Sequence, residues 1–404
     1  MSLKKKIISA VTVLGLMTSA LGFSGCSAAD RGTALTIDGK VIPAGLYILY
    51  SGVAYSEAQT KFREDNPDVD TYADDFDYKS QTVDGKAFDE YVKEKALEGC
   101  QRHAAINKLY DEGGMSADEE QAENLASTVA TQWDFSLTDW ISYIPYAKGY
   151  DTLGAYYEHI GVSKASLKEF YAVNQYKSGS VFDSYYEKGG SKEVSDSEIS
   201  SYIDENYVLT RYFTISLTSE DGEDADRTAE LEKLANDYVK QLNDGTAYKD
   251  VYAKYQDYLN PDNEDSADAA DSDEETEDTD YNRVVNKEDE TPSEEFVESL
   301  FKQSKNSAQL FKTDENLYVV QKLDILTESL DGKKYTETYR SSALSGLKTD
   351  EYEDVLKEVY SAAKVEMNTG IPDYCKEQAE NASNALSTVG TIQYMSYYSS
   401  MMGY

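Results

Sequence analysis

The stretch VSDSEISSYIDENYVLTRYFTISL, residues 194–217, places an amphipathic helix directly before an alternating strand. Ser195 and Glu198 have the spacing of a capping box, which predicts that a helix begins there. Apolar residues follow on one face of that helix. Residues 211–217 then alternate in the manner of a β-strand. Helices and strands that follow one another in this way predict an α+β fold.

Downstream, helices alternate with one more strand. The predicted elements are helices at 228–242 and 248–258, a helix with Thr291 as its N-cap and Pro292 as its first residue, and a strand at 317–325. Between them lies an acidic run, Asp262–Asp280, that contains no Lys or Arg. Such a run cannot bury itself, so residues 262–280 are predicted to form a disordered loop. Together with a boundary at Gly189-Gly190, these elements define a predicted domain over 191–327.

The flanking regions are mostly helical. A strand, a turn at Asp38-Gly39 and a second strand are predicted at 34–42, and an extended piece is predicted at 364–367. The predicted helices begin at Pro43 and at a capping box that starts with Ser116, or cover 88–110, 163–186 and 335–360. Residues 386–404, which end in a Tyr-, Ser- and Met-rich stretch without a cap, are predicted to form a flexible tail. Residues 35–190 and 328–385 are thereby left for a second, helical domain.

The N-terminus has the pattern of an export signal. Lys4-Lys5-Lys6 precede an apolar run at 7–21 and then Phe23-Ser24-Gly25-Cys26. A cysteine directly after small residues resembles a bacterial lipobox, although Phe23 stands where leucine is usual. Residues 1–25 are thus predicted to be a lipoprotein signal peptide, with Cys26 lipidated and 26–34 as a tether. The alternative is an ordinary signal peptide with a chance cysteine. Either pattern predicts an extracytoplasmic protein, and lipidation would anchor it to the membrane.

The composition excludes some classes of function. The net charge of −38 would repel nucleic acids and anionic lipid headgroups, and it suits cationic partners. Cys100 falls on a helical apolar stripe, so a buried thiol is favoured over a disulfide with Cys375. His103 and His159 show no metal-ligand spacing, and no cofactor motif is present. The 35 tyrosines are interpreted as residues of the core edges, the alternative being an adhesive surface for unfolded clients.

The order of elements after residue 191 resembles the parvulin domain of extracytoplasmic folding factors of the PrsA and SurA kind. The matching segments are the 194–206 helix, the Thr214-Ile215-Ser216-Leu217 strand, the piece from Leu242 through Gly245 and Tyr248 to Ala253, Pro292 to Phe296, and 312–320. Ile37-Asp38-Gly39-Lys40-Val41-Ile42-Pro43-Ala44 resembles the start of the same proteins. The resemblance implies a helical chaperone domain built from both chain ends, with an inserted parvulin-like domain in which helices flank a small antiparallel sheet.

Departures from the family pattern affect the expected chemistry. The resemblance implies two histidines and an apolar grip around a twisted prolyl bond, but Thr214 and Tyr318 stand at the histidine positions. Only Phe296 keeps its residue type. The catalytic positions would therefore be Thr214, Tyr318 and Phe296, in a groove emptied of its histidines. Because the hydrogen bonds that weaken amide resonance are missing or rebuilt, weak or no isomerase activity is predicted.

Three functions follow as hypotheses. The first is a membrane-anchored foldase or holdase that binds unfolded or secreted client polypeptides in the helical cleft and the emptied groove. The second is an active peptidyl-prolyl isomerase with a site rebuilt from the same three residues, since a tyrosine hydroxyl can bond an amide. The third is a non-catalytic surface-binding lipoprotein. Specific Ca²⁺ binding by the acidic run is disfavoured, because the run lacks the spacing of an EF-hand loop. The client and the oligomeric state are left open by the sequence.

Overall fold

The computed structural model describes residues 32–73, 76–138, 144–218, 225–259, 278–368 and 370–401. The chain divides into two compact units. Unit 1 consists of the residues up to Asp183 and from Tyr352 onward, and unit 2 is Ser184–Glu351. We expected boundaries at 190/191 and 327/328. The observed boundaries fall within two continuous helices, α6 (Ser178–Tyr186) and α12 (Arg340–Ser361).

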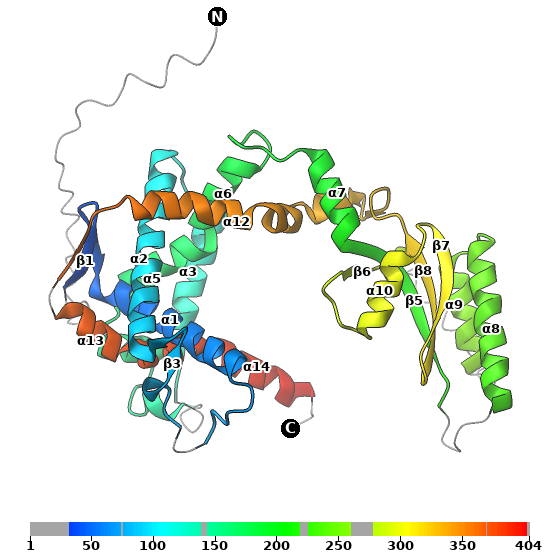
Figure 1. The fold of residues 1–404 in the computed structure, drawn as a ribbon, viewed down its shortest axis with the longest axis horizontal. Coiled ribbons are helices and arrows are strands. Elements are labelled where there is room, and N and C mark those ends of the chain that lie inside the picture. The colour runs from blue at the N-terminus through cyan, green and yellow to red at the C-terminus, as the bar shows by residue number, and fades with distance from the viewer. Residues whose placement is uncertain are drawn as a thin grey trace, which may run out of the picture. The chain divides into compact units, whose positions relative to one another are not determined.

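Unit 1 is mainly helical (Figure 1). Its strands are β1 (Thr33–Ile37), β2 (Lys40–Pro43), β3 (Thr82–Val83), β4 (Lys86–Ala87) and β11 (Val365–Met367). Its helices are α1 (Ala44–Asp65), α2 (Phe88–Glu112), α3 (Glu119–Trp133), α4 (Leu153–Ile160), α5 (Lys164–Ala172), a π-helical turn (Val173–Lys177), α13 (Ile371–Glu377), α14 (Ala379–Met401) and short 3-10 helices at Tyr78–Ser80 and Pro145–Ala147. In the sheet β11-β1-β2, Leu35 pairs with Ile42 on one side and Met367 on the other.

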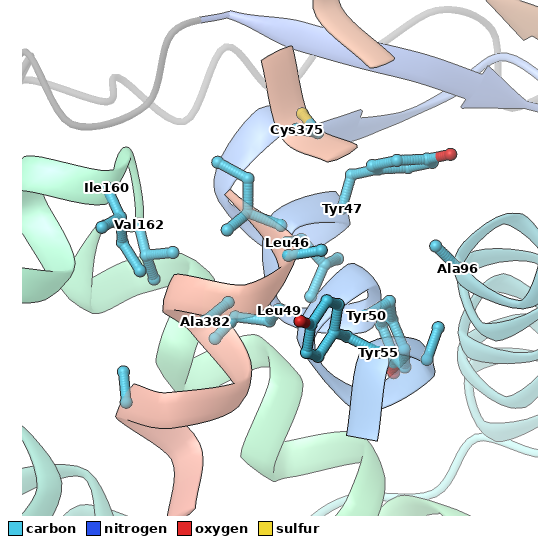
Figure 2. Close-up of a cluster of buried hydrophobic side chains, with 14 of the residues drawn as sticks. Leu46, Tyr47, Leu49, Tyr50, Tyr55, Ala96, Ile160, Val162, Cys375 and Ala382 are labelled. Carbon is cyan, nitrogen blue, oxygen red and sulfur yellow. The ribbon is translucent and has the colours of Figure 1, made fainter. Parts of the chain in front are cut away.

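The core of unit 1 is built from both ends of the chain. Figure 2 shows Leu46 and Leu49 of α1 among side chains from α2, from the α4–α5 region and from the C-terminal helices. Cys375 of α13 and Ala382 of α14 are fully buried in the same cluster. Cys100, on α2, is also fully buried, and both cysteines are free thiols. The favoured interpretation of Cys100 as a buried structural thiol is confirmed.

Helices α1 and α14 pack at very short range. At Gly52 an added Cβ atom would lie 2.7 Å from the Ser383 backbone nitrogen and 2.8 Å from the Ala382 carbonyl carbon. The absence of a side chain at this position therefore permits the contact. Val389 and Ile392, further along α14, are also buried. The predicted flexible tail at 386–404 is wrong for residues 386–401, which are helical because α14 packs on α1.

Unit 2 contains a four-stranded antiparallel sheet in the order β6-β5-β8-β7. Its strands are β5 (Tyr207–Ser216), β6 (Arg283–Asn286), β7 (Ser307–Lys312) and β8 (Asn316–Leu323), with a small hairpin of β9 (Ser329–Leu330) and β10 (Lys333–Lys334). Its helices are α7 (Asp196–Asn206), α8 (Ala225–Asn243), α9 (Tyr248–Leu259), α10 (Glu294–Lys302), α11 (Tyr335–Thr338) and a 3-10 helix at Asp278–Tyr281. The predicted α+β class, with small antiparallel sheets among helices, is confirmed.

The alternation of β5 separates two hydrophobic layers in unit 2. Phe213 and Ile215 face α8 and α9, where they pack with Leu231 and Val251. The opposite face of the sheet packs on α10, and Phe296 is buried in that layer. The sheet thus carries two helices on one face and one helix on the other.

Three local predictions need correction. The helix predicted to begin at Ser116 is capped by Asp118, which forms the capping box with Gln121. The N-cap of α10 is Ser293 rather than Thr291, because the Ser293 hydroxyl accepts the hydrogen bond from Phe296 N–H. Residues 33 and 34 of the expected tether belong to β1. By contrast, the capping box of Ser195 and Glu198 is confirmed.

The acidic run is ordered at its C-terminal end. Cys26 and residues 262–277 lie outside the described residues. Asp278, however, forms an ion pair with Arg211 at 3.1 Å and accepts hydrogen bonds from the backbone N–H groups of Tyr248 and Lys249. The expectation of a disordered loop is therefore wrong for residues 278–280, where Asp278 fixes the start of α9.

Candidate functional site

The structure brings the three predicted catalytic residues together on the α10 side of the sheet. Thr214 on β5 lies opposite Tyr318 on β8 in the antiparallel register. The ring of Phe296 lies 5.0 Å from that of Tyr318, centroid to centroid. Strand pairing and the packing of α10 thus bring these three positions, distant in sequence, into one neighbourhood.

Access to the three residues differs. Phe296 is fully buried and Tyr318 is 8% exposed, whereas Thr214 is exposed. The Phe296 ring packs against Tyr212 and Phe311, with centroid distances of 5.1 and 5.3 Å. Beside Tyr318, aromatic side chains therefore fill the space between the sheet and α10. In this arrangement Phe296 cannot grip a proline ring.

No imidazole is available in unit 2. The two histidines of the chain, His103 and His159, both belong to unit 1. The polar groups beside Thr214 are therefore hydroxyl and backbone groups, together with the Gln256 amide and the Arg283 guanidinium. The carbonyl oxygen of Thr214 already accepts a hydrogen bond from the Tyr255 hydroxyl at 2.7 Å.

A cavity of about 350 Å³ opens beside Thr214, and we call it the tyrosine pocket. It is lined by Tyr212, Phe213, Thr214, Tyr248, Tyr252, Tyr255, Gln256, Leu259, Tyr281 and Arg283. Thr214 lines this pocket, whereas Tyr318 and Phe296 do not. This hollow therefore lies at the edge of β5 rather than between the three predicted residues.

Helical spacing on α9 builds one wall of the tyrosine pocket. Tyr248, Tyr252 and Tyr255 recur along one face of the helix. The Tyr255 ring is stacked on Phe213 with centroids 4.8 Å apart and an angle of 20° between the planes. On the other side, the guanidinium of Arg283 lies 4.5 Å from the centroid of the Tyr212 ring. The sequence signal for this wall was the tyrosine spacing within 248–258.

The pocket presents neutral hydroxyls. Burial raises the pKa of Tyr248 and Tyr255 above the usual value for a phenol. These side chains are therefore protonated at neutral pH and can donate or accept hydrogen bonds. Aromatic faces with polar tips suit peptide segments that combine apolar and polar groups.

A second hollow in unit 2, of about 530 Å³, is acidic. It lies around α10 and is lined by Lys287, Glu288, Asp289, Glu290, Glu294, Glu295, Val297, Glu298 and Phe301. The concentration of carboxylates makes the local potential negative.

Unit 1 has its own groove, about 720 Å³, between α1 and α14. It is lined by Gly52, Val53, Ser56, Glu57, Thr60, Lys61, Glu64, Ser383, Leu386 and Ser387. Val53 is 43% exposed there, so the groove offers apolar surface to solvent.

Unit 1 also holds a polar network around a buried histidine. The Nδ1 atom of His103 lies 3.0 Å from the Tyr50 hydroxyl, and its Nε2 atom lies 2.9 Å from the Asn107 amide nitrogen. The Lys177 ammonium donates to Glu169 at 3.2 Å. The hydrogen bond with His103 and the charge of Lys177 lower the pKa of Glu169 to about 2. The network ties α2, α5 and the π-helical turn together, which is a structural role.

The described part of the chain contains neither a metal-ligand cluster nor a membrane-spanning helix. Within that part, no three His, Cys, Asp or Glu side chains are grouped so that they could hold a metal ion. Among the same residues no helix has the length and apolar character needed to span a bilayer.

Comparisons with known proteins give distant structural likenesses. No protein-family profile and no curated protein sequence matches the chain. The foldase protein PrsA from Streptococcus pneumoniae is similar with a TM-score of 0.30 and 14% identity, over 76% of this chain and 100% of that one. The foldase protein PrsA from Lactococcus lactis is similar with a TM-score of 0.32 and 12% identity, over 86% of this chain and 98% of that one.

Proposed function

We infer that this chain is an extracytoplasmic folding factor that binds unfolded or secreted client polypeptides and has weak or no prolyl isomerase activity. The observation that carries the inference is the contrast within unit 2. The sheet brings Thr214 and Tyr318 together, but aromatic rings occupy the space beside them, and an open tyrosine pocket adjoins instead. This arrangement favours binding of a peptide over rotation of its prolyl bond.

Catalysis of prolyl rotation requires groups that stabilise the twisted amide. Unit 2 contains no histidine, Phe296 is fully buried, and the Thr214 carbonyl is already bonded to Tyr255. These features support a binding function without efficient turnover. Two separate hollows, the tyrosine pocket and the α1–α14 groove, supply surface for client segments.

Membrane anchoring belongs to the same proposal. The Lys-rich start, the apolar run at 7–21 and Cys26 after small residues support export and lipidation. The acyl chains would hold the protein at the outer surface of the membrane, where exported polypeptides emerge unfolded. The strongly negative net charge would keep protein–client complexes soluble.

Two assays test the proposal on the mature chain with Cys26 replaced by Ser. The first is aggregation of a chemically denatured client after dilution, which we expect to slow in proportion to added protein. The second is prolyl-limited refolding at sub-stoichiometric protein, which we expect to be unchanged. Failure to slow aggregation would contradict the binding function. Acceleration of refolding that disappears in Tyr318→Phe would instead establish a rebuilt isomerase site.

A further inference from the structure

The central strand β5 is longer than the neighbour that pairs with it on one side. β6 pairs with residues Tyr207–Thr210, whereas β5 continues to Ser216. Leu217 donates its N–H to Glu315 on the β8 side. Because backbone groups of an antiparallel strand alternate between its two sides, those of Tyr212, Thr214 and Ser216 point away from β8. Within the described ranges, no strand pairs with β5 on that side beyond Thr210.

The tyrosine pocket borders the unpaired edge of β5 at residues 212–216. Tyr212 and Thr214 both line the pocket. An unpaired strand edge can hydrogen-bond an extended peptide, and adjacent pockets can receive alternate side chains of that peptide. The Tyr255 hydroxyl occupies the Thr214 carbonyl but leaves the Thr214 N–H facing the open side. The strand edge could therefore hydrogen-bond the backbone of a peptide segment while the tyrosine pocket receives side chains of the same segment.

Charge indicates the chemistry of that segment. The chain carries a net charge of −38, and six carboxylates and one lysine line the hollow around α10, which lies on the opposite face of the sheet from the tyrosine pocket. Arg283 is the one charged residue among those that line the tyrosine pocket, and its guanidinium is already placed on the Tyr212 ring. Tyrosine faces also attract cations, as the contact between Arg283 and the Tyr212 ring already illustrates. A segment with Lys or Arg among apolar residues would gain from both the field and the aromatic rings.

We propose that unit 2 binds an extended, cationic polypeptide segment as an added strand along residues 212–216 of β5, with side chains of that segment in the tyrosine pocket. The inference rests on the proposed function, because it names the kind of client segment that the folding factor would hold. It differs from prolyl recognition, since backbone pairing and charge rather than a proline ring select the ligand.

Three variants of the mature chain test the proposal. Thr214→Pro removes the outward N–H donor without removing a hydrogen bond between β5 and β8, and proline is tolerated on strand edges. Tyr252→Ala removes part of the pocket wall and keeps the edge intact. Tyr258→Ala is the matched control, because this exposed tyrosine lies on the same helix but does not line the pocket. Thermal unfolding verifies that each variant is folded.

The probes are fluorescein-labelled peptides of about ten residues in which valine alternates with Lys, Gln or Glu. We expect fluorescence anisotropy to show tightest binding of the Val/Lys peptide. Its affinity should fall at least about tenfold in Tyr252→Ala and in Thr214→Pro, and remain unchanged in Tyr258→Ala. Equal affinity for all three peptides, or full affinity in either the pocket variant or the edge variant, would overturn the proposal. If Thr214→Pro does not fold, Tyr252→Ala against Tyr258→Ala still decides whether side chains of the segment enter the tyrosine pocket.

The aggregation assay separates this inference from the proposed function. If the wild-type chain slows client aggregation but both variants keep full affinity for the Val/Lys peptide, client binding stands and the strand-addition site is refuted. If the variants lose the Val/Lys peptide but the wild-type chain never affects aggregation, the binding site stands and the folding-factor function is refuted.

Discussion

The carboxylate of Asp278 accepts hydrogen bonds from two directions: from the guanidinium of Arg211, on β5, and from the backbone at the start of α9. Arg211 is 7% exposed, so the pair is partly removed from water. A single residue at the end of an acidic run thus joins the central strand of unit 2 to the helix that forms the wall of the tyrosine pocket.

Asp278→Ala should destabilise unit 2 by about 2–4 kcal/mol, because it removes the acceptor that caps the start of α9 and leaves the buried Arg211 guanidinium without its carboxylate partner. The measurement is urea unfolding followed by far-UV circular dichroism. Asp257→Ala, which changes an exposed acidic residue of α9, is the control and should shift stability by less than about 0.5 kcal/mol. Equal effects of the two substitutions would contradict the role of Asp278.

Glu169 makes unit 1 sensitive to acid. Its folded-state pKa is about 2, below the ordinary value of 4.5, because of His103 and Lys177. The stabilisation is therefore present above pH 4.5 and is lost as pH falls from about 4.5 to about 2. Since the carboxylate is 44% exposed, we expect a contribution of only about 1 kcal/mol.

The check is unfolding free energy against pH for the wild-type chain and Glu169→Gln. The variant should be less stable at neutral pH and should show a shallower loss between pH 4.5 and 2. Parallel curves would show that the depressed pKa of Glu169 has no part in acid unfolding.

Both thiols of the described chain should be unreactive in the native state. Burial raises the pKa of Cys375 to about 12, and it raises that of the fully buried Cys100 as well. Only the thiolate attacks disulfide reagents. With Cys26 replaced by Ser, an aromatic disulfide reagent at pH 8 should modify no thiol until urea unfolds the protein. Rapid modification without urea would refute the burial of these residues.

Lipidation can be tested through a pair of signal-region variants. Cys26→Ala should move the protein from the membrane fraction to the soluble extracytoplasmic fraction, because the acceptor of the acyl chains is lost. Phe23→Leu, which restores the residue usual in a lipobox, should leave the protein in the membrane fraction. Membrane retention of Cys26→Ala after a high-salt wash would contradict the lipid anchor.

Close packing of the chain ends gives a further prediction. Gly52→Val should destabilise unit 1 by about 3 kcal/mol, because a side chain there collides with the backbone of α14. Gly390→Ala is the control, since an added Cβ at that helical glycine meets no atom within 4 Å. Thermal unfolding should place Gly52→Val several degrees below the wild type and Gly390→Ala at or above it. Equal midpoints would exclude a tight α1–α14 contact.

Short sequence patterns correctly predicted those helices and strands whose formation depends on neighbouring residues in the sequence. The Ser195–Glu198 capping box and the alternation of 211–217 both specify their own neighbourhood, and both predictions hold. β6 was not predicted because four residues are too few to show a period, and this strand depends on pairing with β5. Residues 386–401 were misassigned because their helix is stabilised by contact with α1, far away in sequence.

The candidate site shows the same division. Resemblance placed Thr214, Tyr318 and Phe296 in one neighbourhood, and the sheet register agrees. Their accessibility could not be predicted, since it depends on how Tyr212 and Phe311 pack around Phe296. The tyrosine pocket combines one face of α9, the edge of β5 and a 3-10 helix, so no single segment of the sequence predicts that a pocket forms.

The shared core of the two chain ends sets an order of events during synthesis. A ribosome makes the chain from its N-terminus, so α1 is made first and α14 last, with the whole of unit 2 between them. All of unit 2 is therefore made before α14, the helix that packs on α1, is available. During that interval the protein is itself an incomplete chain with apolar surface exposed, and premature termination before residue 379 would leave it permanently in that condition.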